Sequence, residues 1–507
     1  MPKSVTKVTG TGAERRKNEV RGPMSRYFLL FLLLNAPAVA QQPPASPVKI
    51  GDLTVSGSIR TRIESWDWFT GNANNQYTYP GSILRLSLSE SRKGFDWQIE
   101  LALPFLLGLP ADAIAAGSQG QLGFGATYFA ANGRNTNAAM LFAKQGFLRF
   151  NELGGVKGQS LKLGRMEFID GTEVAPKDST LASLKRERIA HRLIGNFGFS
   201  DVGRSFDGAQ YSLTRSKLNL TLLAARPTRG VFQVDGWGEL KANVFYGALT
   251  GQLPGKTASA EWRIFGLGYS DYRDGVVKTD NRPPAARTAD TDHINIGTYG
   301  GHYLQTVQSP LGAFDLLAWG ALQNGSWGRL AHRAGALAVE AGWQPPALRA
   351  FRPWLRGGLD YGSGDGNPND NTHGTFFQVL PTPRVYARFP FFNLMNNRDA
   401  FGELVLRPSK TLTIRTDVHS LALANRNDLW YSGGGIFQPW TFGYTGRPSN
   451  GQSGLATLFD GSADYNLNAH ASIGLYYGHA AGKLVVQSIY PNGRNANLGY
   501  LELTFRM

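Results

Sequence analysis

Apolar and polar residues alternate along many segments of this 507-residue chain, and the polar positions often carry a charge. In residues 55–64, Ile59 and Ile63 share one face of an extended strand, while Arg60 and Arg62 share the other. A soluble β-sandwich also alternates, but its inner face has no room for repeated charges. A barrel with a water-filled lumen has that room, because its outer face meets lipid and its inner face meets water. The pattern therefore predicts an all-β chain that forms a transmembrane antiparallel β-barrel.

The same two-faced pattern recurs and predicts a series of short strands. They are expected at residues 82–89, 97–103, 144–150, 161–168, 218–223, 244–247, 262–269, 294–305, 312–323, 335–342, 354–361, 412–419, 461–478, 484–487 and 500–507. Segments rich in Gly, Asn, Asp or Pro are expected to form long loops at residues 106–137, 274–292, 363–374 and 425–454. The segment 170–187 is more charged, and its cluster Lys185-Arg-Glu-Arg188 predicts a helical lid.

The composition is compatible with a large barrel. The chain has 62 Gly and 29 Phe, 19 Tyr and 11 Trp, which suits many turns and aromatic girdles at the membrane interfaces. Trp66, Trp68 and Phe69 are predicted to belong to such a girdle. The absence of cysteine is consistent with passage through an oxidising periplasm. The net charge of +15 raises the question of nucleic-acid binding, but the basic residues are scattered singly through alternating strands without a binding motif.

Residues 1–40 are predicted to be a leader and secretory signal peptide, with Met24 as the candidate true start. An arginine, the apolar run Tyr27–Leu34 and the small residues Ala38-Val-Ala40 have the order of such a signal. The apolar run is far shorter than the roughly 20 residues that a spanning helix needs. Residues 41–52 are predicted to be a short periplasmic linker, and residues 53–507 the barrel.

Three sets of residues resemble the signature of a known family. The first is Ser363-Gly-Asp-Gly-Asn-Pro-Asn-Asp370 followed by His373-Gly-Thr-Phe and Pro381-Thr, the second Leu163-Gly-Arg-Met-Glu167, and the third Arg192-Leu-Ile-Gly195 followed by Gly203-Arg-Ser-Phe-Asp207. In their order along the chain, the three sets resemble the signature of the alginate-export family of outer-membrane β-barrel porins. The resemblance implies 18 strands, long extracellular loops, a location in the bacterial outer membrane and transport of an anionic polysaccharide.

Catalysis is not predicted. The eight histidines are scattered without metal-ligand spacing, and His419 and its neighbour Ser420 point to opposite faces of one strand. No nucleophile, base and orienting group come together in the sequence, so the chain is not expected to be an enzyme.

The loop Asp365, Asn367, Asn369 and Asp370 begins like a calcium-binding EF-hand loop. Asp370 stands where that motif requires glycine, and Phe376 where it requires the final glutamate. A solvated Asn/Asp turn without a metal is therefore preferred, and a loosely bound Ca²⁺ that orders an extracellular loop is the alternative. No other cofactor is expected.

Transport is the better hypothesis, because the planar guanidinium of arginine can bind each carboxylate of a polyuronate through two hydrogen bonds. Neighbouring acidic residues weaken the binding at each arginine, so the substrate can move on. The predicted substrate pathway consists of Arg60, Arg62, Glu64, Arg165, Glu167, Arg192, Arg204, Asp207, Arg356, Asp360, Arg384, Arg388, Arg415 and Asp417. For any single arginine, pairing across strands that stiffens the barrel wall is an equally good interpretation. The prediction is an anion-selective lumen for passive export or diffusion of an alginate-like polyuronate or its oligomers.

Two alternatives stay open. One is a general or sugar-specific porin for small solutes. The other is a plugged structural or adhesion barrel, which residues 106–137 or 170–187 would favour if they filled the lumen. The expected partners are the lipid bilayer, lipopolysaccharide, the outer-membrane assembly machinery that reads the C-terminal strand, and periplasmic export proteins; nucleic acid is not among them.

Overall fold

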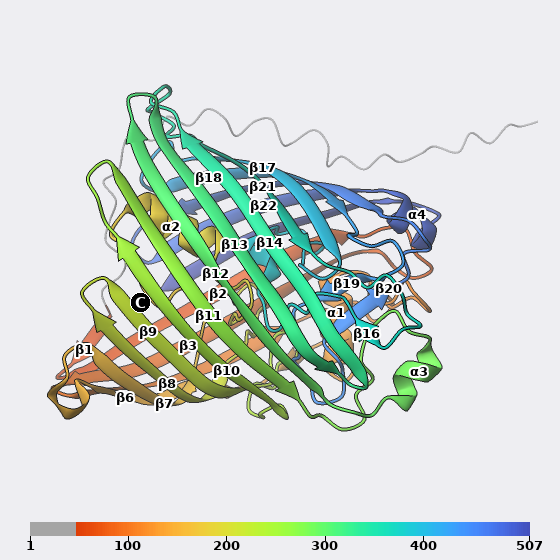
Figure 1. The fold of residues 1–507 in the computed structure, drawn as a ribbon, viewed down its shortest axis with the longest axis horizontal. Coiled ribbons are helices and arrows are strands. Elements are labelled where there is room, and N and C mark those ends of the chain that lie inside the picture. Colours follow the sequence, from red (N-terminus) through yellow and green to blue (C-terminus); the bar gives the residue numbers. More distant parts are fainter. Residues whose placement is uncertain (1–46) are drawn as a thin grey trace, which may run out of the picture. The chain divides into compact units, whose positions relative to one another are not determined.

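The structure is a computed structural model that describes residues 47–507 (Figure 1). The predicted signal peptide, the candidate start at Met24 and the linker residues 41–46 lie outside the described residues. The end of the predicted linker contains a short strand, β1 (Val48–Ile50), which pairs with the beginning of the first long strand.

Eighteen antiparallel strands form one closed sheet, as predicted. Each strand pairs with the next one along the chain, and the last pairs with the first through partners such as Ile59 and Phe505. They are β2 (Leu53–Asp67), β3 (Gln76–Arg92), β4 (Phe95–Leu106), β6 (Phe142–Asn151), β7 (Gln159–Met166), β8 (Phe206–Arg215), β9 (Leu218–Pro227), β10 (Ala242–Leu253), β11 (Ala258–Asp271), β12 (Ile294–Ser309), β13 (Gly312–Trp327), β14 (Leu330–Gln344), β15 (Trp354–Gly362), β17 (Asn397–Leu406), β18 (Leu412–Ala422), β21 (Gly454–Asn466), β22 (Ala471–Gly482) and β23 (Asn495–Arg506).

Alternation along the strands separates two environments. On β13, Leu316 and Leu322 are exposed, whereas Asp315, Trp319 and Gln323 on the other face are buried. The exposed face is the outside of the barrel, and large apolar side chains recur on it from strand to strand. The inner face carries most of the charged residues that the sequence analysis selected. The prediction of one apolar face and one charged face is therefore confirmed.

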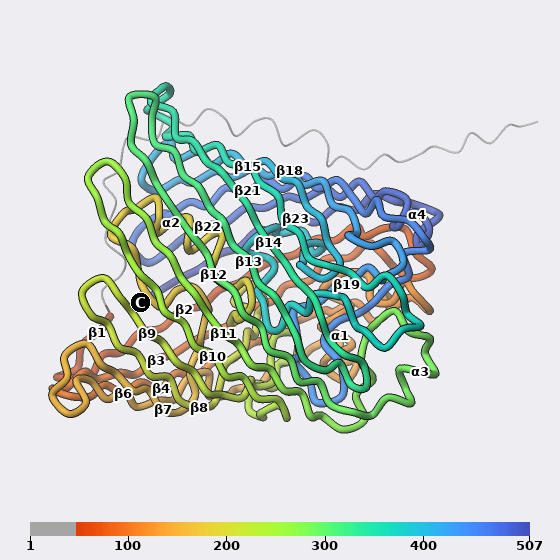
Figure 2. The backbone as a smooth tube through the Cα atoms, in the orientation of Figure 1, coloured from red at the N-terminus to blue at the C-terminus, as the bar shows by residue number. Residues whose placement is uncertain are grey.

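The two ends of the barrel differ in the length of their connections (Figure 2). At the turn end, where the C-terminus lies, the connections have two to nine residues, and one holds the 3₁₀ turn η2 (Leu153–Gly155). At the loop end the connections are L1 (68–75), L2 (107–141), L3 (167–205), L4 (228–241), L5 (272–293), L6 (328–329), L7 (363–396), L8 (423–453) and L9 (483–494). Short turns on one side and long loops on the other are typical of outer-membrane barrels, in which the turns face the periplasm.

The loops contain secondary structure of their own: α1 (Phe124–Ala131), β5 (Ala138–Ala139), α2 (Ser179–Arg188), α3 (Pro284–Ala289), β16 (Thr372–His373), the 3₁₀ turn η3 (Pro383–Val385), β19 (Trp430–Gly433), β20 (Tyr444–Arg447) and α4 (Leu484–Ile489). The helix predicted within 170–187 is confirmed by α2. The strand predicted at 484–487 is wrong, because α4 forms there and buries Val485, Val486 and Ile489 at helical spacing. Within the part of the chain that the structure describes, no helix is both long and apolar enough to cross a bilayer.

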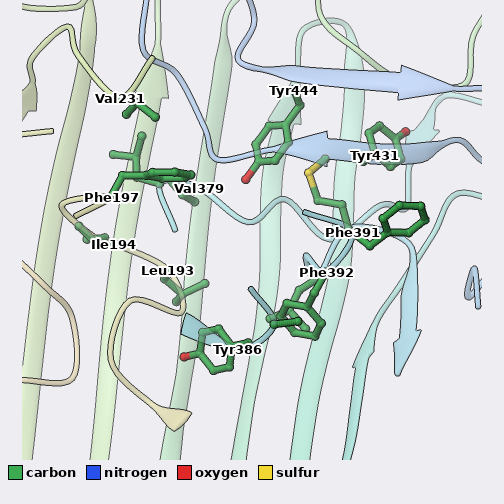
Figure 3. Close-up of a cluster of buried hydrophobic side chains, with 14 of the residues drawn as sticks. Leu193, Ile194, Phe197, Val231, Val379, Tyr386, Phe391, Phe392, Tyr431 and Tyr444 are labelled. Atoms are coloured by element: carbon green, nitrogen blue, oxygen red, sulfur yellow. The ribbon is translucent and has the colours of Figure 1, made fainter. Parts of the chain in front are cut away.

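Several loops fold into the barrel and form an apolar core there. Phe197 of L3, Val379 and Phe392 of L7 and Tyr431 and Tyr444 of L8 are all buried in one cluster (Figure 3). Figure 1 shows α2 of L3 far from the other helices, toward the turn end. The interior of this barrel is thus shared between charged wall residues and an apolar core made by loops.

The predicted aromatic girdle at Trp66, Trp68 and Phe69 is wrong. All three side chains are buried inside, and Trp68 stacks on Phe389 of L7 with ring centroids 5.9 Å apart. Trp66 lies on the inner face of β2, and Trp68 and Phe69 follow in L1, so these side chains pack against loops rather than lipid.

Candidate substrate pathway

Helix α2 is attached to the barrel wall by a buried cluster of ion pairs. Its N-terminus is capped by Asp178, whose side chain accepts a hydrogen bond from the Leu181 amide at 2.9 Å, and basic residues occupy its last turn. Arg188 Nε lies 2.8 Å from Glu340 Oε2 on β14, and Arg192, one turn further on, lies 2.7 Å from Asp360 Oδ1 on β15. None of these four side chains is more than 1% exposed.

The same cluster continues along the wall. Arg356 on β15 pairs with Glu340 at 2.9 Å and with Asp315 on β13. We call Arg188, Arg192, Arg356, Asp315, Glu340 and Asp360 the L3 latch. The three positive charges of the arginines balance the three negative charges of the carboxylates in a buried site. Each charged group is stabilised by its partners, and removal of a partner costs free energy.

A second set of contacts attaches L3 to β11 and β12. Lys185 Nζ lies 2.7 Å from Glu261 Oε1, which is also 3.1 Å from His302 Nε2. Arg263 lies 3.3 Å from Glu173 of L3. The predicted lid is therefore held along five neighbouring strands of the wall, β11 to β15.

The predicted residues Arg60, Arg62 and Glu64 form a cluster on β2. Arg62 lies 2.6 Å from Glu502 on β23 and 3.3 Å from Glu64. Arg60 donates to the carbonyls of Gly198 at 2.7 Å and Ser200 at 2.5 Å. L3 is therefore bound to the closing strands of the barrel as well.

Between this cluster and the turn end lies a cavity of about 270 Å³, which we call the vestibule. Its charged lining consists of four basic side chains, Arg60, Arg85, Lys144 and Arg506, and two acidic ones, Glu167 and Glu502. Glu167 lies 3.4 Å from Arg85 and 3.5 Å from Lys144. L3 residues between Gly198 and Gly203 close it on the other side. Arg85 also pairs with Glu100, and Arg60 with Asp201, outside the lining. The vestibule therefore presents basic side chains, most of them with an acidic partner, next to the periplasmic turns.

Arg165 and Asp207 form a pair on neighbouring strands. Arg165 Nε and Nη2 lie 2.7 and 2.6 Å from the two carboxylate oxygens of Asp207. Arg165 Nη1 and Nη2 also donate to the backbone carbonyls of Gly236 and Trp237 in L4. This two-pronged pair fixes L4 to the wall. It stands apart from the L3 latch.

Two predicted arginines bind carbonyls instead of carboxylates. Arg204 is fully buried and donates to the carbonyls of Gly195, Leu380, Gly434 and Ile436, at 2.6 to 3.3 Å, which joins L3, L7 and L8. Arg384 donates to the carbonyls of Arg388, Phe389 and Phe392 within L7. Burial without a paired carboxylate lowers the pKa of each guanidinium to about 10.

The last predicted group lies on β17 and β18, the strands that follow β15 in the sheet. Arg415 lies 2.6 Å from Glu403 and 3.1 Å from Asp417. Arg388 lies 3.3 Å from Asp464, and 28% of its side chain is exposed. The structure thus brings most of the predicted residues together in four groups at the wall. Glu167 lines the vestibule, Arg388 of L7 pairs with Asp464, and Arg204 and Arg384 lie among the loops. Whether they contact a substrate stays a prediction.

Comparison with known proteins places the chain in a family. A model of the family described as alginate export matches residues 53–485. The chain belongs to the alginate export family. No curated protein sequence matches it significantly. The family and the barrel fold are those of channels in the bacterial outer membrane.

Solved structures with the same fold are outer-membrane porins. OccK9 (OpdG) of Pseudomonas aeruginosa has a TM-score of 0.56 at 10% identity, and OccAB4 of Acinetobacter baumannii has 0.52 at 8%; each comparison covers 90% of this chain and 98% of the other. OpdK of Pseudomonas aeruginosa, crystallised with vanillate, has 0.51 at 7%, over 89% and 98%. At these identities the likeness shows the fold alone.

Several charged residues of this alginate export family member that lie next to the predicted pathway were not predicted from the sequence. Arg85, Glu100 and Arg506 line cavities at the turn end, and Glu340 lies at the centre of the L3 latch. Each lies on the polar face of a predicted strand, so the alternation contained the signal. Arg188 belongs to the cluster predicted as a lid, but its partner on β14 could not be inferred from sequence spacing.

The candidate calcium loop forms turns on its own backbone. Asp365 accepts from the Asn367 amide at 3.0 Å, Asn367 from the Asn369 amide at 3.2 Å, and Asp370 from the Thr372 amide at 2.8 Å. Within residues 47–507, no group of three or more His, Asp or Glu side chains is arranged to hold a metal ion. Ca²⁺ binding at this loop stays a prediction.

A buried histidine pair attaches L7 to the wall. His373 Nδ1 of β16 lies 2.9 Å from His332 Nδ1 of β14, and the His373 ring stacks on Trp327 at 4.1 Å between centroids. His373 is fully buried. A hydrogen bond between two Nδ1 atoms requires one ring to donate and the other to accept, so a proton on both Nδ1 atoms breaks it.

Acidification should loosen this part of L7. Burial, with His332 and Arg282 nearby, holds the pKa of His373 well below its ordinary value near 6.5. When His373 is detached from the wall, its ring binds a proton that the buried ring does not bind. The stability of the attached state is therefore lost as pH falls below about 6.5. Hydrogen exchange of residues 372–378, corrected for its intrinsic pH dependence, should be faster at pH 5 than at pH 7.5. The variant His373→Gln should show a smaller difference, and equal protection of the native loop at both pH values would contradict the prediction.

Proposed function

We propose that this barrel conducts an anionic polysaccharide of the polyuronate type, or its oligomers, across the outer membrane by passive diffusion through an anion-selective lumen. The observation that carries the proposal is the vestibule, where four basic side chains face two acidic ones at the periplasmic end. Arginine and lysine side chains attract carboxylates, and the acidic groups that pair with them prevent a permanent hold on the substrate. Lipopolysaccharide, the assembly machinery and periplasmic export proteins are the partners expected with this function.

Passage of a polymer requires L3 to move. L3, L7 and L8 pack on a common apolar core inside the barrel, and the L3 latch holds α2 against the wall. The loops are therefore the gate in this proposal, and the vestibule is the part of the pathway that lies on their periplasmic side.

Planar bilayers test the function directly. The mature chain is reconstituted, and single-channel conductance and the reversal potential under a KCl gradient are recorded with and without an oligouronate. We expect anion-selective steps that the oligouronate blocks. Steps without anion preference and without block would assign the protein to general porins for small solutes.

The double variant Arg85→Gln, Arg506→Gln should reduce anion selectivity and weaken block by the oligouronate. It removes two of the four basic groups of the vestibule, and both side chains also line the neighbouring cavity at the turn end. The reversal potential under the same gradient measures the effect. The control Lys241→Gln changes an exposed lysine of L4 that pairs with Asp274, and it should leave the reversal potential unchanged. Unaltered selectivity in the double variant would remove the vestibule from the pathway.

A specific observation also favours a plugged barrel with a structural or adhesive role. α1 buries Tyr128 and Phe129, and the segment 170–187 contacts β11 through Lys185 and β14 through Thr180, so both segments named as potential plugs contribute to the interior. Absence of conductance in the wild-type chain and in a variant with an opened latch would support this second candidate.

A further inference from the structure

A second cavity, of about 180 Å³, lies at the loop end. L1, L2, L3, L4, L7 and L8 all contribute to its lining, and none of its lining residues lies on the eighteen barrel strands. It is therefore a separate site from the vestibule, on the extracellular side of the barrel. We call it the outer pocket.

The outer pocket holds positive charge without a counter-ion. Arg447 is 5% exposed; it donates to Ser432 Oγ at 2.7 Å and to the Gln119 carbonyl at 3.4 Å, and its Nε has no hydrogen-bond partner. Arg384, the second arginine in the lining, donates only to carbonyls. No carboxylate is among the lining residues. A buried guanidinium without a paired anion is costly, and an anionic ligand would remove that cost.

The same wall offers a second unused donor. The Nε1 atom of Trp430 is buried without a hydrogen-bond partner, and the guanidinium carbon of Arg447 lies 4.9 Å from the centre of the Trp430 ring. Two free N–H groups of neighbouring side chains, both buried, require an acceptor that the protein itself does not supply. The pocket is therefore suited to a ligand rich in oxygen acceptors.

Aromatic rings and neutral polar groups complete the lining. Phe392 and Tyr444, both in the cluster of Figure 3, lie beside Trp68 and Trp430 in the wall. Among them are amide and hydroxyl side chains, which are Gln121, Thr127, Asn393, Ser432, Thr441 and Thr445. A pyranose ring presents C–H groups on its faces, which pack on aromatic rings, and hydroxyl groups at its edge, which bond to such side chains.

The dimensions limit the ligand to one ring. The volume of about 180 Å³ is below the roughly 300–1,000 Å³ of sites for drug-sized ligands. Gly433 and Thr445, on the β19–β20 hairpin, are exposed members of the lining and form its rim. A longer chain could therefore enter the outer pocket with one terminal unit only.

We propose that the outer pocket binds a single hexuronate ring, with its carboxylate at Arg447 and its C–H face on the aromatic wall. The inference rests on the proposed function, since it assigns a unit of an anionic polysaccharide to a defined subsite at the extracellular mouth. It adds a binding step that selects the charge and the ring together.

Calorimetric titration of the purified full barrel in detergent with sodium D-glucuronate tests the proposal, with D-glucose and benzoate as comparison ligands. Glucuronate should bind saturably. D-glucose and benzoate should each bind about tenfold or more weakly, because D-glucose lacks the carboxylate and benzoate lacks the sugar ring. Absence of saturable glucuronate binding, or tighter binding of benzoate, overturns the proposal.

The variant Arg447→Gln should weaken glucuronate binding about tenfold or more, the effect expected for a lost charge-assisted hydrogen bond. The matched control Arg226→Gln, an exposed arginine that pairs with Glu239 outside the pocket, should bind as the wild type does. Equal affinity of Arg447→Gln and wild type would overturn the proposal. If Arg447→Gln does not fold into a barrel, Trp430→Phe keeps the ring, removes the free N–H and should weaken binding; unchanged binding there would equally count against the pocket.

Bilayer conductance separates this proposal from the proposed function. Wild type that conducts anions but does not bind glucuronate would refute the outer pocket and leave the channel intact. Binding that depends on Arg447 without any conductance would uphold the pocket and refute the channel.

Discussion

The variant Glu340→Gln is expected to open the barrel. Glu340 lies next to Arg188, Arg192 and Arg356 in the L3 latch, with separations of 2.8, 3.5 and 2.9 Å. Glutamine has nearly the same shape but no charge, so three buried guanidinium groups would share two remaining carboxylates. Removing one partner of a buried ion pair typically costs about 3–5 kcal/mol. The cost falls on the attached state of L3, and we expect a larger single-channel conductance with more frequent opening.

The absence of cysteine allows a direct measurement of this release. Ala190 of L3 is fully buried, so Ala190→Cys introduces the single thiol of the chain at a position that a maleimide reaches only when L3 moves. Labelling should be slow in the otherwise native chain and fast when Glu340→Gln is added. The control Glu239→Gln removes an exposed carboxylate of L4 and should alter neither labelling nor conductance. Slow labelling and native conductance in Glu340→Gln would show that the latch does not hold L3.

The variant Arg204→Ala is expected to separate the loops from each other while leaving the wall intact. The Arg204 side chain binds four backbone carbonyls in L3, L7 and L8, in addition to the backbone hydrogen bonds that L3 and L7 share. Unpaired buried acceptors cost about 1–3 kcal/mol each, although the Leu380 carbonyl keeps the amide of Gly195 as a second partner. The summed cost is comparable with the free energy of unfolding of many whole domains. Lysine cannot replace Arg204, because a single ammonium group cannot reach carbonyls on two sides.

Hydrogen exchange distinguishes the loops inside the barrel from the strands of the wall. In Arg204→Ala, protection should fall in residues 193–204, 378–382 and 434–438, and stay native in the strands. Arg204→Lys should give an intermediate loss. Uniform loss across the strands would instead mean that the barrel itself depends on this side chain, and unchanged protection would mean that the apolar core holds the loops without it.

The wall could be predicted from the sequence because strand faces follow from position alone. Arg62 and Ile63 must point to opposite sides whatever else the chain does, and that rule placed Arg60, Arg165, Arg356 and Arg415 inside. The rule does not extend to loops. Arg192 and Arg204 are fully buried there, for reasons that depend on contacts between segments more than 150 residues apart.

The aromatic residues show the same limit. Trp68 and the run Phe389–Phe392 have no alternation that distinguishes lipid-facing from inward-facing rings, and amphipathic aromatics are common at membrane interfaces. Their burial results from L1 and L7 meeting inside the barrel, where Trp68 stacks on Phe389. Likewise, Leu484–Gln487 is apolar enough for a strand or a helix, and only the packing of Val486 and Ile489 decides for α4.

The pairing of β2 with β23 imposes a condition on assembly. Its side-chain contacts include one between Arg62 and Glu502, which lie 440 residues apart. Until these strands meet, each has a row of unpaired backbone groups that can template wrong pairing. Contacts of such sequence separation form late and slowly. An assembling chain therefore carries two open edges through almost the whole process, and escapes aggregation only if another protein or the bilayer covers them until the sheet closes.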